Sequence, residues 1–477
     1  MIYSAAPEFL PLADAFADAA SPAHFRMAVL RFRNTRWASR VGLEKLGDEA
    51  WLNSFARFEP LSENLPHPLA MRYHGHQFGV YNPELGDGRG FLFAQLRDDT
   101  GRVLDLGTKG SGQTRWSRSG DGRLTLKGGV REVLAAQYLE AHGVKTSKPF
   151  SLVETGDELQ RNDEPSPTRS AVLVRLSHSH IRFGTFQRSA YLGETENLAR
   201  LIRHCAETYY PETLDTDITV MAPALLERIT GETARMIAQW MATGFVHGVM
   251  NTDNFNITGE SFDYGPWRFL PHSDPNFTAA YFDQQGLYRF GRQPTQGLWA
   301  LQQLASTFTL VCDADPLTAA LETYETAYQH ALADHNLKLF GLKSAGGLKS
   351  DLIFLQSLYN WMSETQVPWA QVFFDWFCGT KSAERAARSP IASQYETPGF
   401  APVREALEAR TPDRPERLIH AYWQRETPVT LLVDDVEGLW DPIADKDDWS
   451  VFEHTLADIE AARQALDIPF EAPPKEA

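Results

Sequence analysis

The sequence predicts an α+β protein with two lobes, a small β-rich lobe followed by a large helical one, and an extension at each end. Its 477 residues exceed the roughly 250 to 300 residues at which a single hydrophobic core stops growing. Strand patterns with turn signals are concentrated between residues 86 and 176, whereas helical periodicity prevails after about residue 191. Strands that come first and helices that come later, without regular alternation, indicate the α+β class.

We expect four segments along the chain. The first mixes short helical patterns with prolines, which is typical of an extension wrapped over a lobe rather than of an independent domain. The last is rich in aspartate and carries a short predicted helix at 451–466 before an end that we expect to fray. The predicted segments are an N-terminal extension (1–72), the β-rich lobe (73–190), the helical lobe (191–426) and an acidic C-terminal tail (427–477).

Composition excludes several classes of protein. The net charge of −17 disfavours a general nucleic-acid binder, because such binding depends on neutralising phosphates with Lys and Arg. No run approaches the ~18 apolar residues that span a membrane, and the N-terminus lacks the basic stretch of a secretory signal. The three cysteines lie far apart, without the spacing of a zinc site or a disulfide framework. We therefore expect a soluble protein of the reducing cytoplasm, with neither a membrane nor a nucleic acid as partner.

The β-rich lobe begins with a glycine-rich turn and a hairpin. Gly86, Gly88 and Arg89 precede the first hairpin strand, and Lys109 ends the second. Glycines at such a turn let backbone N–H groups approach phosphate oxygens, and an arginine adds a bidentate donor, although glycine-rich turns also occur without a ligand. The hairpin strands are predicted at 91–96 and 103–109.

A basic segment interrupts this acidic chain. Residues 102–131 carry seven basic side chains against two acidic ones, Asp105 and Asp121. A local basic patch suits a compact anionic ligand such as a triphosphate, but a solvated basic face would have the same composition. The polar loop 110–122 at its centre ends with Asp121 and Gly122.

A helix follows this loop. An apolar stripe predicts it at about 127–142, with Gly143 at its end. Glu132 lies on this helix and has two candidate environments. It can form the lysine–glutamate pair of a kinase-like nucleotide site with Lys109, or it can face solvent as most helical glutamates do.

The next strand leads out of the small lobe. It is predicted at 171–176 and carries Arg175, and the connection 177–186 carries Arg182. Both arginines are candidates for nucleotide contact. The helices of the large lobe are predicted at 195–209, 223–243, 294–312, 317–336 and 348–363, with apolar and aromatic stripes at 352–361 and 369–376 that are typical of core.

The stretch 245–265 places polar side chains in a loop typical of a metal–nucleotide site. Protein kinases carry H-R-D-x-x-x-x-N followed by D-F-G, in which the first Asp accepts the substrate proton and the Asn and the second Asp bind magnesium. Counting from His247, Asn254 occupies the metal-binding Asn position and Asp263 begins the D-F-G equivalent, but Val249 occupies the catalytic Asp position. A valine cannot accept a proton, so the sequence keeps the metal-binding part and lacks the usual base.

Two alternatives remain for the polar motifs. Asn, Asp, Thr and Gly also gather in turns, where their side chains bond the local backbone, so the stretch 245–265 could be a turn without a ligand. His74 and His76 could bind a metal, but on a glycine-flanked turn they more often orient backbone.

Six runs resemble the selenoprotein O family in order and identity. They are YHGHQFG (73–79), GDGR (86–89), LGTKGSGQT (106–114), SRSGDGR (117–123), SHIRFGTF (179–186) and HGVMNTDNFNITGESFDYGP (247–266). The resemblance spans roughly residues 73–270 and continues more weakly to about 345. It implies a protein-kinase-like fold and a protein adenylyltransferase, in which ATP binds reversed relative to kinases and AMP moves to Ser, Thr or Tyr hydroxyls of proteins, with pyrophosphate released.

The same resemblance implies a role for each matching residue. Asp253 would be the proton acceptor, Asn254 and Asp263 the ligands of magnesium or manganese, and Glu132 the partner of Lys109. The implied nucleotide contacts are Gly86, Gly88, Arg89, Lys109, Asp121, Gly122, Arg175 and Arg182. A reversed nucleotide places its departing pyrophosphate against these basic groups.

The C-terminal region departs from the family. Many members carry a Cys or selenocysteine near the C-terminus, whereas this chain has no cysteine after Cys378, so a redox switch built on that residue is not expected. The region beyond about residue 420 also lacks the Asn-Pro and Arg-Asn run expected near the end of the helical lobe.

Three functional hypotheses follow. The first is a metal-dependent protein adenylyltransferase that acts on protein hydroxyls, its own included. The second is a kinase that uses Asp253 as a displaced base, and the third is a non-catalytic nucleotide-binding pseudokinase that scaffolds partners. Transfer of the α-phosphate or the γ-phosphate of ATP separates the first two hypotheses.

Overall fold

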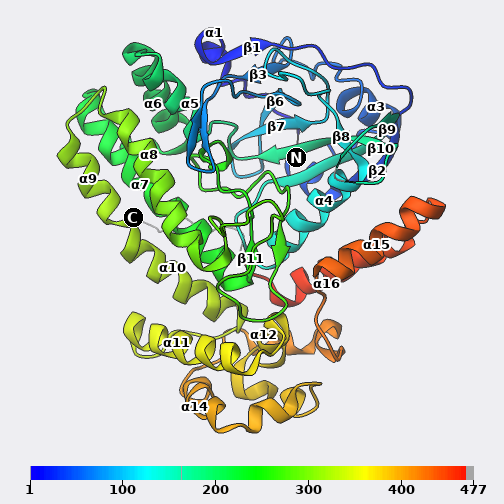
Figure 1. Ribbon diagram of the computed structural model, residues 1–477, viewed down its shortest axis with the longest axis vertical. Helices are drawn as coiled ribbons and strands as arrows, with labels where there is room; N and C mark the ends of the chain where they lie inside the picture. The colour runs from blue at the N-terminus through cyan, green and yellow to red at the C-terminus, as the bar shows by residue number, and fades with distance from the viewer. Residues whose placement is uncertain (1, 163, 469–477) are drawn as a thin grey trace.

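The computed structural model describes residues 2–162 and 164–468 (Figure 1). It is a mixed α/β structure with one large sheet and many helices, as expected for the α+β class. The sheet and helix α4 lie at one end of the molecule, and helices α7–α14 extend toward the other (Figure 1). Within the described ranges, no helix has the length and apolar character needed to cross a membrane.

The large sheet has eight strands and joins residues from the extension to residues of the predicted β-rich lobe. Its order is β1-β3-β6-β7-β10-β9-β2, with β8 paired to β10, and every recorded pairing is antiparallel. The strands are β1 (Ala17–Ala19), β2 (Val29–Arg33), β3 (Leu69–Met71), β6 (Leu92–Arg97), β7 (Val103–Lys109), β8 (Leu124–Thr125), β9 (Lys148–Leu159) and β10 (Thr168–Ser177). The predicted hairpin is confirmed as β6 and β7.

Two short pairs of strands lie outside this sheet, close to the predicted site. Strand β4 (Gly75–Gln77) lies in the YHGHQFG run and pairs with β5 (Val80–Asn82), which follows it, and β11 (Phe245–Val246) pairs with β12 (Arg268–Phe269) around the polar loop. The β11–β12 pairing brings the two ends of the stretch 245–269 together, so that the stretch forms one closed loop.

The helices mostly confirm the predicted pattern. They are α1 (Ala13–Phe16), α2 (Thr35–Arg40), α3 (Asp48–Phe55), α4 (Leu126–Ala141), α5 (Phe183–Tyr191), α6 (Thr195–Tyr209), α7 (Ile218–Thr243), α8 (Gln293–Phe308), α9 (Ala314–Glu322), α10 (Tyr324–Leu339), α11 (Gly347–Thr365), α12 (Trp369–Asp375), α13 (Ala383–Ala386), α14 (Ala401–Glu408), α15 (Val433–Lys446) and α16 (Ser450–Leu466). A 3₁₀ turn, η3 (Thr252–Asn254), lies in the polar loop.

Some boundaries were predicted wrongly. The helix predicted at 317–336 is two helices that meet at Thr323, where the backbone N–H donates to the Leu321 carbonyl instead of continuing the α-helical pattern. Helix α7 begins before Pro223, where Asp217 caps it by accepting from the Thr219 N–H at 2.9 Å.

Two segments contain a helix that the sequence did not predict. The connection predicted at 177–186 already includes the first turn of α5, and the acidic tail contains α15. Helix α15 forms because the Asp435 carboxylate accepts from the Leu432 N–H at 2.9 Å at its start. The predicted fraying end at 469–477 lies outside the described residues.

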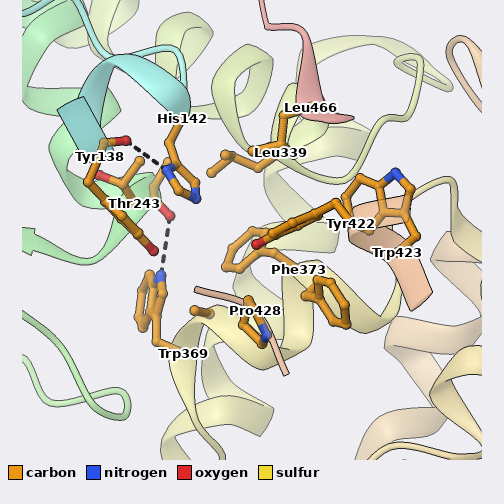
Figure 2. A pocket seen from close by; sticks show the side chains of 13 residues that line it. Tyr138, His142, Thr243, Leu339, Trp369, Phe373, Tyr422, Trp423, Pro428 and Leu466 are labelled. Atoms are coloured by element: carbon orange, nitrogen blue, oxygen red, sulfur yellow. Dashed lines mark hydrogen bonds between the residues drawn. The ribbon is translucent and has the colours of Figure 1, made fainter. Parts of the chain in front are cut away.

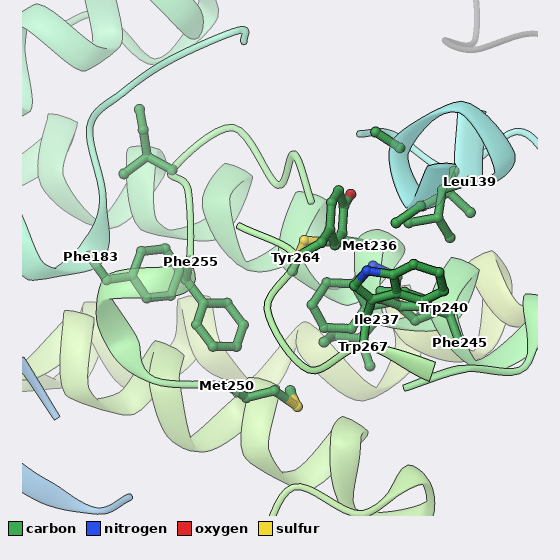
Figure 3. Close-up of a cluster of buried hydrophobic side chains, with 14 of the residues drawn as sticks. Leu139, Phe183, Met236, Ile237, Trp240, Phe245, Met250, Phe255, Tyr264 and Trp267 are labelled. Atoms are coloured by element: carbon green, nitrogen blue, oxygen red, sulfur yellow. The ribbon is translucent and has the colours of Figure 1, made fainter. Parts of the chain in front are cut away.

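A continuous hydrophobic core underlies the polar loop (Figure 3). Leu139 of α4, Trp240 of α7 and Tyr264 of the loop are all buried in it, and Phe183 stacks on Phe255 with ring centroids 5.3 Å apart. Because the same core holds residues before and after the polar segments, it fixes the loop against both α4 and α7.

Candidate functional site

His247 anchors the polar loop from inside the core. It is 1% exposed, its backbone N–H donates to Gln293 Oε1 at 3.0 Å, and its Nε2 hydrogen-bonds the Phe262 carbonyl at 3.0 Å. Burial lowers the pKa of His247, which keeps the ring neutral. His247 therefore holds the backbone next to Asp263 in place and is not itself positioned as an acid or base.

Asp253 has a buried and unused carboxylate oxygen. It is 8% exposed, and within the part of the chain that the structure describes no donor reaches its Oδ1. Burial raises the pKa of Asp253 to about 6, although Arg182 acts in the opposite direction. A buried carboxylate with a raised pKa and a free oxygen can accept a proton from a hydroxyl that enters the site.

Asn254 is oriented by the residue that replaces the kinase aspartate. Its Nδ2 donates to the Val249 carbonyl at 3.1 Å. Because the amide nitrogen is used in this way, the carbonyl oxygen is the atom that Asn254 can offer to a cation. Val249 thus contributes a backbone acceptor where a side-chain base is absent.

Asp263 lies within a cluster of opposite charges. Lys109 Nζ is 2.7 Å and Arg175 Nη1 is 3.3 Å from Asp263 Oδ1, and Lys109 also forms an ion pair with the buried Glu132. Burial alone would raise the pKa of Asp263, but Lys109 and Arg175 outweigh it and hold that pKa well below its ordinary value. Asp263 has a φ of 63°, a left-handed conformation that Asp adopts more readily than most residues. The structure thus brings together residues from β7, α4, β10 and the loop, and Glu132 is buried rather than facing solvent.

Arg182 connects this cluster to the glycine-rich turn. Its Nη1 donates to the Asp253 backbone carbonyl and its Nη2 to Asp87 Oδ1, both at 3.2 Å, and its guanidinium lies 4.5 Å from the Tyr73 ring centroid. Burial alone would lower the pKa of Arg182, but Tyr73 and Asp87 outweigh this effect and raise that pKa. A permanently charged guanidinium therefore lies directly beside Asp253.

An open cleft of about 670 Å³ contains most of the predicted site. Of the sequence-predicted residues, the cleft is lined by Gly86, Gly88, Arg89, Asp121, Gly122, Arg182, Asp253 and Asp263. Lys109, Arg175 and Glu132 are not among the lining residues. Lys109 and Arg175 contact Asp263, and Glu132 forms an ion pair with Lys109. The volume is sufficient for a nucleotide-sized ligand.

The glycines of the turn are explained by close packing. A Cβ atom on Gly86 would lie 2.4 Å from Trp116 Cγ, and one on Gly88 would lie 2.9 Å from the Trp116 carbonyl oxygen. The turn therefore rests directly on residue 116 at the wall of the cleft. Asp121 is exposed at the outer end, where it forms an ion pair with Arg161 at 2.8 Å.

The His180 ring packs on β7, the strand that ends at Lys109. The His180 ring packs against Gly107 so closely that a Cβ atom there would lie 1.8 Å from His180 Nε2. His180 is itself held by its backbone N–H, which donates to Asp105 at 2.7 Å. Neither His180 nor Gly107 is among the residues that line the cleft, which extends to Trp116 and Arg161.

The YHGHQFG run supports the loop, a role that sequence analysis missed. The His76 N–H donates to Thr252 Oγ1 at 2.7 Å, Thr252 donates to Gln187 Oε1 at 2.6 Å, and Gln187 Nε2 lies 2.9 Å from His76 Nδ1. A Cβ atom on Gly75 would lie 2.9 Å from Asp253 Oδ1. The His74 ring bonds the Tyr81 hydroxyl at 2.8 Å and the His76 ring bonds Gln187, so both rings contact side chains.

The donor set fits a divalent cation that is shared with a phosphate. Among residues 2–162 and 164–468, no group of three or more His, Cys, Asp or Glu side chains could hold a metal alone. Asp263 and the unpartnered Oδ1 of Asp253 line the same cleft, and Asn254, the neighbour of Asp253, offers its amide oxygen but is not among the lining residues. Magnesium sites commonly use one or two carboxylates and complete their coordination with substrate phosphates and water.

A second, apolar cavity lies at the C-terminal end of α4, where Tyr138 and His142 line it (Figure 2). Its volume is about 40 Å³, and Tyr138, Trp369 and Tyr422 are among its lining residues. The Trp369 indole N–H donates to the Ala242 carbonyl at 3.3 Å, and His142 Nδ1 bonds the Tyr138 carbonyl at 2.8 Å. The cavity is too small for a nucleotide, so the cleft at Asp253 is the candidate site.

Comparisons with known proteins point to one family. A family model described as "Protein adenylyltransferase SelO" matches residues 2–460. The chain is 41% identical over 468 residues to "Protein nucleotidyltransferase YdiU" of Synechocystis sp., covering 95% of this chain and 97% of the relative. It is 40% identical over 470 residues to the protein of the same name from Trichodesmium erythraeum, with 95% and 97% covered.

Proposed function

Because the chain belongs to the SelO family of protein adenylyltransferases, with ATP as substrate, we propose how its own residues transfer AMP to protein hydroxyls. We assign the cleft at Asp253 as the site of transfer. The observation that carries this assignment is the convergence of an unpartnered, buried Asp253 oxygen with the Lys109–Asp263–Arg175 charge cluster.

The nucleotide lies with its phosphates toward the cluster and its base toward the outer cleft. Support comes from the basic groups Lys109 and Arg175 at Asp263, and from the space in the same cleft near Trp116 and Arg161. In this orientation the basic groups face the β- and γ-phosphates, and the α-phosphorus is presented near Asp253. The predicted contacts Gly86, Gly88, Arg89, Lys109, Asp121, Gly122, Arg175 and Arg182 are assigned to this nucleotide.

Asp253 accepts the proton of the incoming Ser, Thr or Tyr hydroxyl. The hydroxyl oxygen forms a bond to the α-phosphorus, the bond between that phosphorus and the bridging oxygen breaks, and pyrophosphate leaves with the bonding electron pair. Lys109 and Arg175 stabilise the charge that develops on the leaving group. Proton transfer of this kind contributes about 10²- to 10⁴-fold to the rate.

Asn254 and Asp263 would hold the divalent cation, magnesium or manganese. When bound, such an ion would polarise the α-phosphate and offset phosphate charge. Lys109 and Arg175 hold Asp263 ionised and oriented toward the cleft. Glu132 positions Lys109 in turn.

We also assign the protein-kinase-like, two-lobed arrangement to this chain. The lysine on β7, the glutamate on α4 and the following helical region support it. The acceptors are proteins, with this chain among them, and a reducing, ATP-rich cytoplasm suits a chain with three free thiols.

Transfer of label from two forms of ATP tests the proposed function. The protein is incubated with acceptor protein and ATP labelled at either the α- or the γ-phosphate. We expect α-label on protein and γ-label only in pyrophosphate. Attachment of γ-label alone would instead show a kinase, and retention of ATP binding without any transfer would show a pseudokinase.

A further inference from the structure

An exposed group of apolar side chains lies beside the polar loop. We define the aromatic patch as Phe78, Val80, Tyr281 and Phe282, of which Val80 is 70% and Tyr281 80% exposed. Phe78 and Phe282 come from segments more than 200 residues apart, yet their ring centroids lie 5.8 Å apart. Contiguous exposed apolar surface commonly marks an interaction site.

The patch is fixed in position relative to Asp253. Asn251, two residues before Asp253, accepts from the Phe78 backbone N–H at 3.1 Å and from the Tyr288 hydroxyl at 2.9 Å through the same Oδ1. The Phe78 ring also lies 4.8 Å from the Tyr288 ring. Asn251 thus connects Phe78, and the Tyr288 ring on which Phe78 packs, to the loop that carries Asp253.

The patch is joined to the cleft through Gln77. Gln77, the neighbour of Phe78, lines the cleft together with Asp253. Any hydroxyl that reaches Asp253 from another protein must bring flanking residues to the edge of the cleft, where Phe78 follows Gln77 in the chain.

Local charge indicates the chemistry of the partner. The segments 75–82 and 275–282 contain no Asp, Glu, Lys or Arg, although the chain as a whole carries a net charge of −17. An uncharged apolar surface favours apolar partners and offers no ion pair to charged ones.

We propose that the aromatic patch docks the acceptor segment of the substrate protein through an apolar or aromatic side chain near the modified hydroxyl. This inference rests on the proposed function and adds a specificity determinant to it. The patch positions the hydroxyl at Asp253 and contacts neither the nucleotide nor the reacting atoms, so its loss affects protein acceptors according to their flanking residues.

Two peptide families test this inference. Both carry a central Ser, Thr or Tyr, flanked in one family by Leu and Phe and in the other by Gly and Gln, and transfer from α-labelled ATP is measured as kcat/KM. We expect the wild-type protein to favour the apolar family about tenfold, the effect of one well-buried contact. The double variant Phe78→Ser/Phe282→Ser should reduce this ratio to about one while leaving the Gly/Gln rate within about twofold.

The matched control is Ile353→Ser, which removes an apolar side chain that is 59% exposed on α11. It should leave the peptide preference unchanged. Wild-type protein without a preference, a double variant that keeps it, or an equal loss for both families would each overturn the inference.

Two more results would overturn docking for different reasons. Label on no peptide and no protein would contradict the proposed function, and the docking inference with it. Concentration-dependent dimerisation of the wild-type protein that the double variant abolishes, measured by sedimentation, would assign the patch to a contact between two copies and overturn substrate docking.

Discussion

At the scale of single residues, Gly75 limits where Asp253 can lie. A Cβ atom at position 75 would come within 2.9 Å of Asp253 Oδ1, closer than carbon and oxygen normally approach. We expect Gly75→Ala to displace the carboxylate and to lower kcat about 10- to 100-fold, because small displacements of a catalytic group are costly. Steady-state transfer of α-label, together with thermal unfolding, measures this effect.

The control for that substitution is Gly47→Ala, because a Cβ atom there meets nothing within 4 Å. It should leave kcat unchanged, while the unfolding temperature falls slightly because Gly47 is the N-cap residue of α3 and Ala is a poorer cap. A G75A protein with wild-type kcat would show that Asp253 does not need its observed position.

Asp253 provides a second test at this scale. Asp253→Asn preserves the shape of the side chain but cannot accept the proton, so we expect kcat to fall about 10²- to 10⁴-fold. ATP affinity, measured by calorimetry, should stay within about threefold because the phosphates are held elsewhere. A fall in transfer that is matched by an equal loss of ATP affinity would assign Asp253 to binding instead.

Sequence patterns predicted some residues of the site and missed others for a physical reason. Lys109, Glu132 and Asp263 occupy positions defined by local motifs, and the structure brings them into one cluster. Gly75 and Gln187 act through contacts with residues 65 to 178 positions away. Such long-range packing leaves no local pattern, although the conspicuous YHGHQFG run signalled that the segment has a specific role.

At the scale of elements, the C-terminal helices α15 and α16 are tied to the sheet. Between them, Asp447 accepts from Arg169 of β10 at 2.7 Å and from Arg31 of β2 at 3.0 Å. Helix α16 packs against α4, which carries Glu132 (Figure 1). The C-terminal helices therefore brace the helix that positions Lys109.

The pH dependence of this contact can be predicted. The hydrogen bond from Arg169, assisted by Trp449, lowers the pKa of Asp447 to about 2. An Asp with a lowered folded-state pKa stabilises the protein above its unfolded pKa of about 3.9 and loses that contribution as the pH falls toward 2. Asp447→Asn should lower the unfolding temperature by about 1 to 2 °C at pH 7, because a half-exposed pair contributes at most about 1 kcal/mol.

The difference in unfolding temperature between wild type and D447N should then shrink as the pH is lowered from 4 to 2. Asp441→Asn, an exposed change on α15, is the matched control and should have no effect on the unfolding temperature. A D447N difference that is independent of pH would contradict the assignment of the stabilisation to the ionised carboxylate.

The sequence predicted long, regular elements better than short or interrupted ones. Helix α6 has the predicted bounds, and β6, β7 and α4 agree within about two residues. Strand β9 was missed because Pro149 and Gly156 interrupt its pattern, and the break at Thr323 is a change in one backbone hydrogen bond that periodicity does not detect. In α15, the buried Val436, Leu439 and Ile443 form a helical stripe that the surrounding aspartates obscured.

At the scale of the whole molecule, a buried ion pair joins the sheet to the polar loop. Lys148 Nζ of β9 lies 2.6 Å from Glu260 Oε1, and their side chains are 1% and 0% exposed. Glu260 also accepts from the His178 N–H at 2.8 Å. The pair fixes the segment that leads to Asp263 against the sheet that carries Lys109.

Removing one partner should destabilise the protein strongly. Lys148→Met leaves a buried carboxylate without its cation, and we expect a loss of about 3 to 5 kcal/mol in the free energy of unfolding. Lys148→Met combined with Glu260→Gln should be more stable than Lys148→Met alone, because the uncompensated charge is gone. Denaturant unfolding of the two variants measures this, and strictly additive effects would show that the two side chains are not coupled.

The proposed transfer of AMP requires a triphosphate that points inward, toward Lys109 and Arg175, so that the α-phosphorus lies near Asp253. A crystal structure with a non-hydrolysable ATP analogue and magnesium shows this orientation directly. We predict the terminal phosphates within hydrogen-bonding distance of Lys109 and Arg175, and the adenine at the outer end near Trp116 and Arg161. Adenine in the position of the His180 ring, with the γ-phosphate nearest Asp253, would rule out the inward orientation.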